Sequence, residues 1–176
     1  MAACLSLIFS QASAQVLSIG PTAIPPLRGS GVIALGNAQS INGSLATVAF
    51  DTLGYDSFGI CDTTSTKGVC TVTAATAGKY HISCSARIDA TTGPAVGGII
   101  GQIRVWKNGA AITGGLAASY AQVASIASVQ TYVNNATVAS FVAGDTFSCA
   151  ASSGATGPTV AASFGGSFLS YEYIGP

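Results

Sequence analysis

The chain has 176 residues, of which only 7 % are charged, and its six basic and six acidic side chains leave no net charge. An average soluble protein has about 25 % charged residues. Nothing in this composition would neutralise a phosphate backbone, which excludes nucleic acid as an expected partner. No apolar run reaches the roughly 18 residues of a transmembrane helix, so we expect no membrane span. A surface so poor in charge is typical of a protein covered by its own copies or by a partner.

The first thirty residues differ in character from the rest of the chain. Residues 3–9 are apolar and resemble the core of a signal peptide, and residues 12–14 resemble a cleavage site. The first basic residue is Arg28, so the positively charged start of a signal peptide is missing. Three prolines favour an extended path. These prolines are Pro21, Pro25 and Pro26. We therefore expect residues 1–30 to form a retained arm before a single domain at residues 31–176.

Alternation of apolar and polar residues dominates the second part of the chain and predicts β-strands. From Tyr80 to Ile88 every second residue is apolar, and His81 lies on the polar side of the same run. Expected strands lie at residues 33–35, 46–50, 80–89, 99–105, 146–151 and 164–173, and residues 117–129 are expected as strand or loop. Short strands at regular spacing without helices between them indicate an all-β antiparallel sandwich.

Turn residues separate these runs. Asn42-Gly43 and Asn108-Gly109 suit tight hairpins, since both central positions of a type I′ turn need a positive φ. Gly157-Pro158 breaks the chain before the last strand.

Five cysteines are present, and an odd number argues against a dedicated disulfide framework. Cys61 and Cys70 flank a short polar loop and are a candidate disulfide across a hairpin. We expect Cys84 and Cys149 to be free buried thiols. The fifth cysteine is Cys4, and no C-x-x-C spacing supports a zinc site.

The order of the motifs resembles that of the C1q/TNF-like jelly-roll family over residues 50–173. The resemblance rests on Phe50, Tyr55-Asp56, Gly78-Lys79-Tyr80, Lys107-Asn108-Gly109, Gly144-Asp145, and the last strand, where Phe164-Gly165-Gly166 precedes Leu169. It implies a ten-stranded jelly roll that trimerises about a threefold axis and has a binding or structural role without catalysis. Family members that bind calcium cluster their acidic residues, whereas the six acids here are scattered, so no calcium site is carried over.

Catalytic chemistry has little support in this sequence. His81 is the only histidine, and no G-x-S-x-G elbow supplies a nucleophile for it. Asp51 and Asp56 are expected to cap a turn rather than to form the carboxylate pair of a glycosidase. We expect no catalytic residue, no metal and no cofactor.

Aromatic residues are the remaining candidates for contacts. Trp106 alternates away from the buried side of its strand, which suits either a sugar site or a subunit interface, and the low charge favours the interface. The interface candidates are Trp106, Phe164, Phe168, Tyr171 and Tyr173.

The leading hypothesis is a virion protein: a homotrimeric jelly roll that decorates or cements the capsid of a tailed phage, or forms a head fibre, with the N-terminal arm gripping another virion protein. A receptor- or glycan-binding fibre tip is the first alternative. A secreted C1q-like binding module is the second, and it requires cleavage after Ala14 and bridged cysteines.

Overall fold

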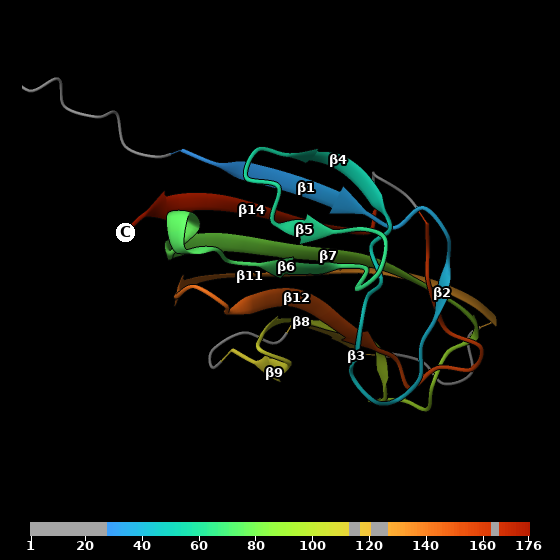
Figure 1. Cartoon of the computed structure of the whole chain (residues 1–176). Coiled ribbons are helices and arrows are strands. Elements are labelled where there is room, and N and C mark those ends of the chain that lie inside the picture. Colours follow the sequence, from blue (N-terminus) through green and yellow to red (C-terminus); the bar gives the residue numbers. More distant parts are fainter. Residues whose placement is uncertain (1–27, 113–116, 121–126, 163–165) are drawn as a thin grey trace, which may run out of the picture.

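The computed structural model describes residues 28–112, 117–120, 127–162 and 166–176, which form two antiparallel sheets packed face to face (Figure 1). Sheet A contains β1 (Ser30–Ala34), β2 (Gln39–Ser40), β4 (Thr52–Asp56), β7 (Gly78–Thr92), β11 (Ala127–Phe141), β13 (Thr159–Val160) and β14 (Phe168–Gly175). Sheet B contains β3 (Ala46–Thr47), β5 (Cys61–Asp62), β6 (Val69–Thr71), β8 (Ile99–Lys107), β9 (Ala110–Ala111), β10 (Ala117–Tyr120) and β12 (Thr146–Ser152). The antiparallel sandwich predicted from the sequence is confirmed.

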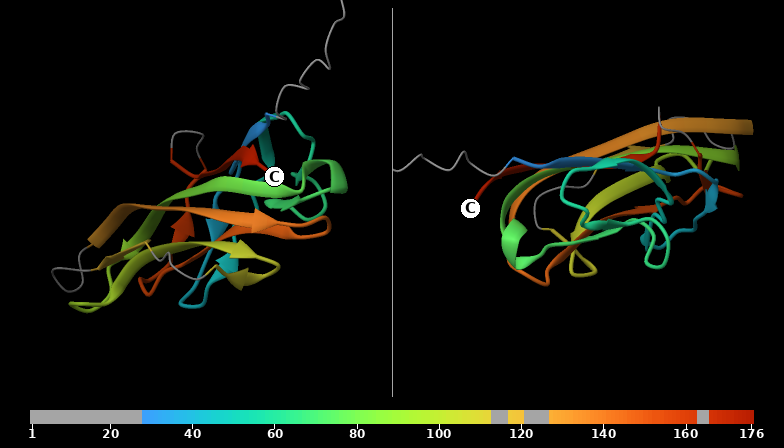
Figure 2. Two further views of the ribbon diagram at one scale, coloured as in Figure 1. Left: turned by 90° about the vertical axis from the view of Figure 1, so that its left-hand side faces the viewer. Right: turned by 45° about the horizontal axis from the view of Figure 1, so that its top comes forward.

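Sheet A is organised around β7. On one edge β7 pairs with β14, which continues to β1 and β4, while its far end pairs with β13. On the other edge β11 pairs with β7 along its whole length, from Ala127 opposite Thr92 to Phe141 opposite Gly78. Figure 2 shows this two-stranded ribbon curving along the sandwich. A single 3₁₀ turn, η1 (Ala74–Thr76), precedes β7 and is the only helical element among the described residues.

An aromatic cluster fills one end of the core. Tyr80 of β7 is fully buried, and the centroid of its ring lies 5.3–5.8 Å from four other aromatic rings. Its hydroxyl donates to the backbone carbonyl of Thr76, so the polar atom of this buried ring has a partner. The other four rings belong to Phe141, Phe147, Tyr171 and Tyr173. The cluster joins both sheets, since Phe147 comes from β12.

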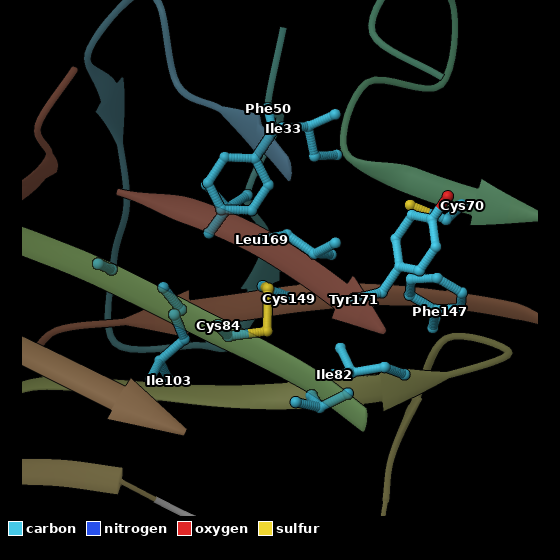
Figure 3. Close-up of a cluster of buried hydrophobic side chains, with 14 of the residues drawn as sticks. Ile33, Phe50, Cys70, Ile82, Cys84, Ile103, Phe147, Cys149, Leu169 and Tyr171 are labelled. Atoms are coloured by element: carbon cyan, nitrogen blue, oxygen red, sulfur yellow. A yellow bond between two sulfur atoms is a disulfide. The ribbon is translucent and has the colours of Figure 1, made fainter. Parts of the chain in front are cut away.

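A disulfide between Cys84 and Cys149 links the two sheets through the core (Figure 3). The prediction of free thiols at these positions is wrong. Both side chains point inward, as the alternation indicated, but β7 and β12 also cross with the two residues directly opposite, their Cα atoms 5.8 Å apart. That distance suits a disulfide. A second disulfide joins Cys61 to Cys70, which face each other on β5 and β6.

Two of the turn predictions have different outcomes. Asn108 and Gly109 have positive φ values of 52° and 74° and join β8 to β9 in a hairpin, which confirms that prediction. The hairpin expected at Asn42-Gly43 is wrong, because β2 pairs with β13 in sheet A and β3 pairs with β12 in sheet B. Residues 41–45 therefore carry the chain from one sheet to the other.

The arm expected at residues 1–30 lies almost entirely outside the described residues, and β1 begins at Ser30. In the stretch at residues 117–129, residues 117–120 form the strand β10 and residues 127–129 begin β11, while residues 121–126 lie outside the described residues. None of the helical structure that is described has the length and apolarity needed to cross a bilayer.

Candidate interface on the outer face of sheet A

Large apolar side chains are exposed mainly on sheet A. Of the seven that are largely exposed among the described residues, five lie on its strands. Each of the five is more than half exposed: Leu53, Tyr55, Tyr132, Val138 and Ile174. The other two lie in connections, at Val96 and Val142. Clustering of such side chains on one face of a soluble protein is typical of a binding surface.

The register of sheet A places two of these side chains, Val138 and Tyr55, in adjacent rows. His81 of β7 stands between Glu172 of β14 and Val138 of β11, so the three side chains form one row on the outer side. The next row crosses five strands and consists of Tyr55, Val32, Ser170, Ser83 and Ala136. We call this outward surface of β4, β1, β14, β7 and β11 the A face.

A groove of about 1060 Å³ lies on the A face. Its lining includes three short side chains, those of Ser30, Ser57 and Ser170, and Ser170 belongs to the second row. Tyr55 stands at one side of the groove and Val138 at the other, and Ile174 lies at the end of β14. Arg28, His81 and Glu172 also line it.

The charges farther along the A face are paired. The guanidinium of Arg87 lies 2.9 Å from the carboxylate of Asp89, and the amide of Gln130 donates to the same carboxylate. The hydrogen bond to Asp89 raises the pKa of Arg87 above its ordinary value. The A face therefore combines apolar contact area with charges of both signs, which also include Lys79 of β7 and Glu172 of β14.

A hydrogen-bonded corner holds the rim of the groove in place. The carboxylate of Asp56, at the end of β4, accepts the backbone N–H groups of Gly59 at 2.9 Å and Cys61 at 2.7 Å. It also accepts the hydroxyl of Tyr171. Burial of the phenol, followed by its bond to this carboxylate, raises the pKa of Tyr171 above its ordinary value. Asp56 thus fixes the strand that carries Tyr55, as its predicted role in a turn requires.

The aromatic residues predicted for an interface are not brought together. Tyr171 and Tyr173 point inward and are only 3 % and 8 % exposed, which differs from the surface position expected of them. Phe168 is half-buried on the outer side of β14, opposite Ser85. Trp106 lies on the outer side of sheet B, paired with Ser148 of β12. Phe164 lies outside the described residues.

Sequence reasoning missed Tyr55, Tyr132 and Val138. The last two lie on β11, whose inward positions include the polar Asn135 and Thr137 and so weaken the apolar alternation. Asn135 nevertheless has an inward partner, because its side-chain oxygen accepts the backbone N–H of Val105 across the sandwich at 3.2 Å. The signal that was available in the sequence is the alternation of β-branched residues at positions 129, 131, 133 and 137, which favours a strand.

Two of the acidic side chains, Asp51 and Asp62, accept hydrogen bonds that hold turns. Asp62 accepts hydrogen bonds from the backbone and hydroxyl groups of residues 64–66, which lower its pKa. Asp51 accepts the N–H of Gly36, and that bond is the main cause of its lowered pKa. No group of three histidine, cysteine, aspartate or glutamate side chains that could hold a metal is found among the described residues.

Comparison with known proteins gives the fold. No family model matches the sequence, and no curated protein matches it. Solved structures do: the crystal structure of murine APRIL has a TM-score of 0.57 at 11 % identity, covering 84 % of this chain and 100 % of the other.

The globular domain of zebrafish complement 1qA has a TM-score of 0.52 at 12 % identity, covering 85 % and 96 % of the two chains. Eiger TNF from S. frugiperda has a TM-score of 0.55 at 12 % identity, covering 85 % and 93 %. The chain therefore has a C1q/TNF-like jelly-roll fold, and at these identities the similarity shows the fold alone.

Proposed function

We propose that this chain is a non-enzymatic binding or structural module that assembles as a homotrimer through the A face. The observation that carries the proposal is the groove, which is lined by exposed apolar side chains and by three serines. Such a surface offers close backbone approach and apolar area to a partner. The similarity to TNF and C1q domains supports the choice of a trimer.

The charge pattern supports a second copy of this chain as the partner. In a trimer that closes around the A face, each copy turns the same face toward the threefold axis, so a face of one net sign would repel its copies. The A face avoids this, since Arg87 is paired with Asp89, and the groove contains one arginine and one glutamate. Apolar contact is then the main source of affinity.

The proposal is tested with two variants, one that introduces a charge inside the groove and one that introduces a charge outside it. Val138→Glu would bury a carboxylate in every contact between copies, and each such burial costs several kcal/mol. We expect the trimer to be replaced by folded monomers in native mass spectrometry and sedimentation velocity, because Val138 is exposed within one chain. Val96→Glu, in the exposed connection between β7 and β8, is the matched control and should leave the trimer intact. A monomeric wild-type protein, or a trimeric Val138→Glu protein, would refute the proposed assembly.

The disulfides favour the alternative in which this protein is secreted. All four cysteines of the described residues are bridged, which is typical of proteins that mature in an oxidising compartment. Cleavage after Ala14 would remove Cys4 and leave an even set of cysteines. The intact mass of the exported protein should match a chain that starts at Gln15 and has two disulfides. An intact mass that includes Met1, with free thiols, would exclude this route.

A virion decoration or cement protein is the second candidate, favoured by the 7 % charge content together with the apolar A face. In that case the arm at residues 1–30 would attach the trimer to a capsid. Deleting residues 2–28 should then abolish binding to particles while leaving the trimer folded. Normal particle binding by the shortened chain would count against the arm.

A further inference from the structure

We propose that Asn42 is a site of self-modification, at which the chain loses the side-chain amide of Asn42 by attack of its own backbone, with water as the only co-reactant. The inference is independent of the proposed function. It rests on the contrast between the two Asn-Gly pairs of this chain, Asn42-Gly43 and Asn108-Gly109. Both asparagines are exposed, and a side chain added at either glycine would meet no atom within 4 Å.

The reaction is balanced without an oxidant or a cofactor. The backbone nitrogen of Gly43 attacks Cγ of Asn42, forming an N–Cγ bond as the Cγ–Nδ2 bond breaks. The proton of the Gly43 amide ends on the departing nitrogen, which leaves as ammonia, and a five-membered succinimide remains. Water then opens either carbonyl of the ring to give aspartate or isoaspartate. Glycine favours this step because no Cβ hinders the attacking nitrogen.

Asn42 is held in a way that leaves the reacting groups accessible. Its side-chain oxygen accepts the backbone N–H of Ser44 at 2.9 Å, so the amide carbonyl stays on the side of the intervening residue, Gly43. Its Nδ2, the leaving group, donates to no described residue, and neither does the backbone N–H of Gly43. The backbone carbonyl of Asn42 accepts the N–H of Ser153 at 2.8 Å, which ties this residue to the rest of the fold.

Asn108 is held at both ends of its amide. Its Nδ2 donates to the carboxylate of Asp145 at 2.8 Å, and its Oδ1 accepts the backbone N–H of Thr146 at 2.8 Å. Both bonds must open before Cγ can approach the Gly109 nitrogen. If each opening costs what an ordinary protein hydrogen bond contributes, we expect Asn108 to react at least about tenfold more slowly than Asn42.

The modification would alter a defined part of the molecule. Asn42 lies on the connection between β2 and β3, which Figure 1 places at the end of the sandwich away from the C-terminus. Each event replaces a neutral amide by a carboxylate in a chain with no net charge. Isoaspartate would also insert an extra backbone atom where the chain crosses between the sheets.

The test is a time course on the purified full chain at body temperature and mildly alkaline pH. Cleavage after lysine and arginine separates the two sites, because Asn42 lies in residues 29–67 and Asn108 in residues 108–176. Tandem mass spectrometry should show the gain of about one mass unit at Asn42, with an isoaspartate fraction, at least about tenfold faster than at Asn108. In the reduced protein in denaturant, the two sites should react at similar rates.

Gly43→Ala is the matched variant, since the open space around Gly43 lets the fold accept a methyl group. It should suppress the reaction at Asn42 and leave the rate at Asn108 unchanged. Equal rates at the two sites in the folded protein, or no reaction at Asn42, would overturn the inference.

Discussion

Sheet A and sheet B are built by the same alternation, yet their outer faces differ. Sheet A exposes Tyr55, Val138 and other large apolar side chains around a groove. The outer side of β8 and β12 in sheet B carries one large aromatic side chain, the half-buried Trp106, among short or polar ones. There the amide of Gln102 donates to the hydroxyl of Ser152 across the two strands. Alternation therefore determines which side chains are buried in both sheets. The side chains that remain outside determine which sheet offers a surface for binding.

The two sheets also fix their edges by different means. At the A face a buried aromatic hydroxyl, that of Tyr171, reaches the turn carboxylate of Asp56. Sheet B relies on polar turns, in which Asn108 and Lys107 both bind Asp145. Substitutions that remove one of these interactions at a time test the contrast between the two sheets.

The largest effect on stability is expected from the disulfide that joins the sheets. Replacing Cys84 and Cys149 together by alanine removes a crosslink between residues 65 positions apart, and the chain-entropy estimate for such a loop is about 4 kcal/mol. Replacing Cys61 and Cys70, only nine positions apart within sheet B, should cost about 3 kcal/mol. Denaturant unfolding of both double variants measures which disulfide contributes more to the free energy of unfolding. A larger loss of stability for the pair within sheet B would contradict the prediction.

A smaller effect is expected at the turn of sheet B. Asn108→Ala loses the bonds to Asp145 and Thr146 and places alanine at a φ of 52°, so we expect a loss of about 2 kcal/mol. Asn108→Gly loses the same bonds but accepts the positive φ, and it should cost about 1 kcal/mol less. Equal stabilities of the two variants in denaturant unfolding would mean that the backbone conformation contributes nothing.

Much of the inner architecture could be predicted from the sequence, because it depends on local alternation. The inward series from Tyr80 to Ile88 and the hairpin at Asn108-Gly109 are examples. The partner of Cys84 could not be predicted, since the pattern shows which way a side chain points but not what stands opposite it. The prediction of a hairpin at Asn42-Gly43 failed for a related reason, because a turn dipeptide does not show which sheet the next strand joins.

The A face was beyond sequence reasoning because the pairing of five strands assembles it. Tyr55 and Ala136 are 81 positions apart in the sequence, yet the register places them in one row. Three of the aromatic residues chosen from the sequence, Phe168, Tyr171 and Tyr173, belong to a strand whose tyrosines fill the core. Aromatic character alone did not separate a core position from a contact position.

The smallest effect is expected from the pH dependence of the turn in sheet B. Hydrogen bonds from Asn108, Lys107 and the backbone of Val142 lower the pKa of Asp145 from 3.8 to about 2. Because the folded state favours the ionised carboxylate, its contribution to stability is present above pH 3.8 and is lost as the pH falls toward 2. Asp145→Asn should therefore lose less stability than the wild type over this interval.

The measurement is the denaturant midpoint of both proteins at several pH values across that interval. Asp51 and Asp62, whose pKa values are also lowered, are present in both proteins, so the difference between the two curves isolates Asp145. Parallel curves would mean that the bonds at this turn do not favour the carboxylate. Converging curves would assign part of the acid sensitivity of the protomer to sheet B, in a turn that contributes no residue to the groove of the A face.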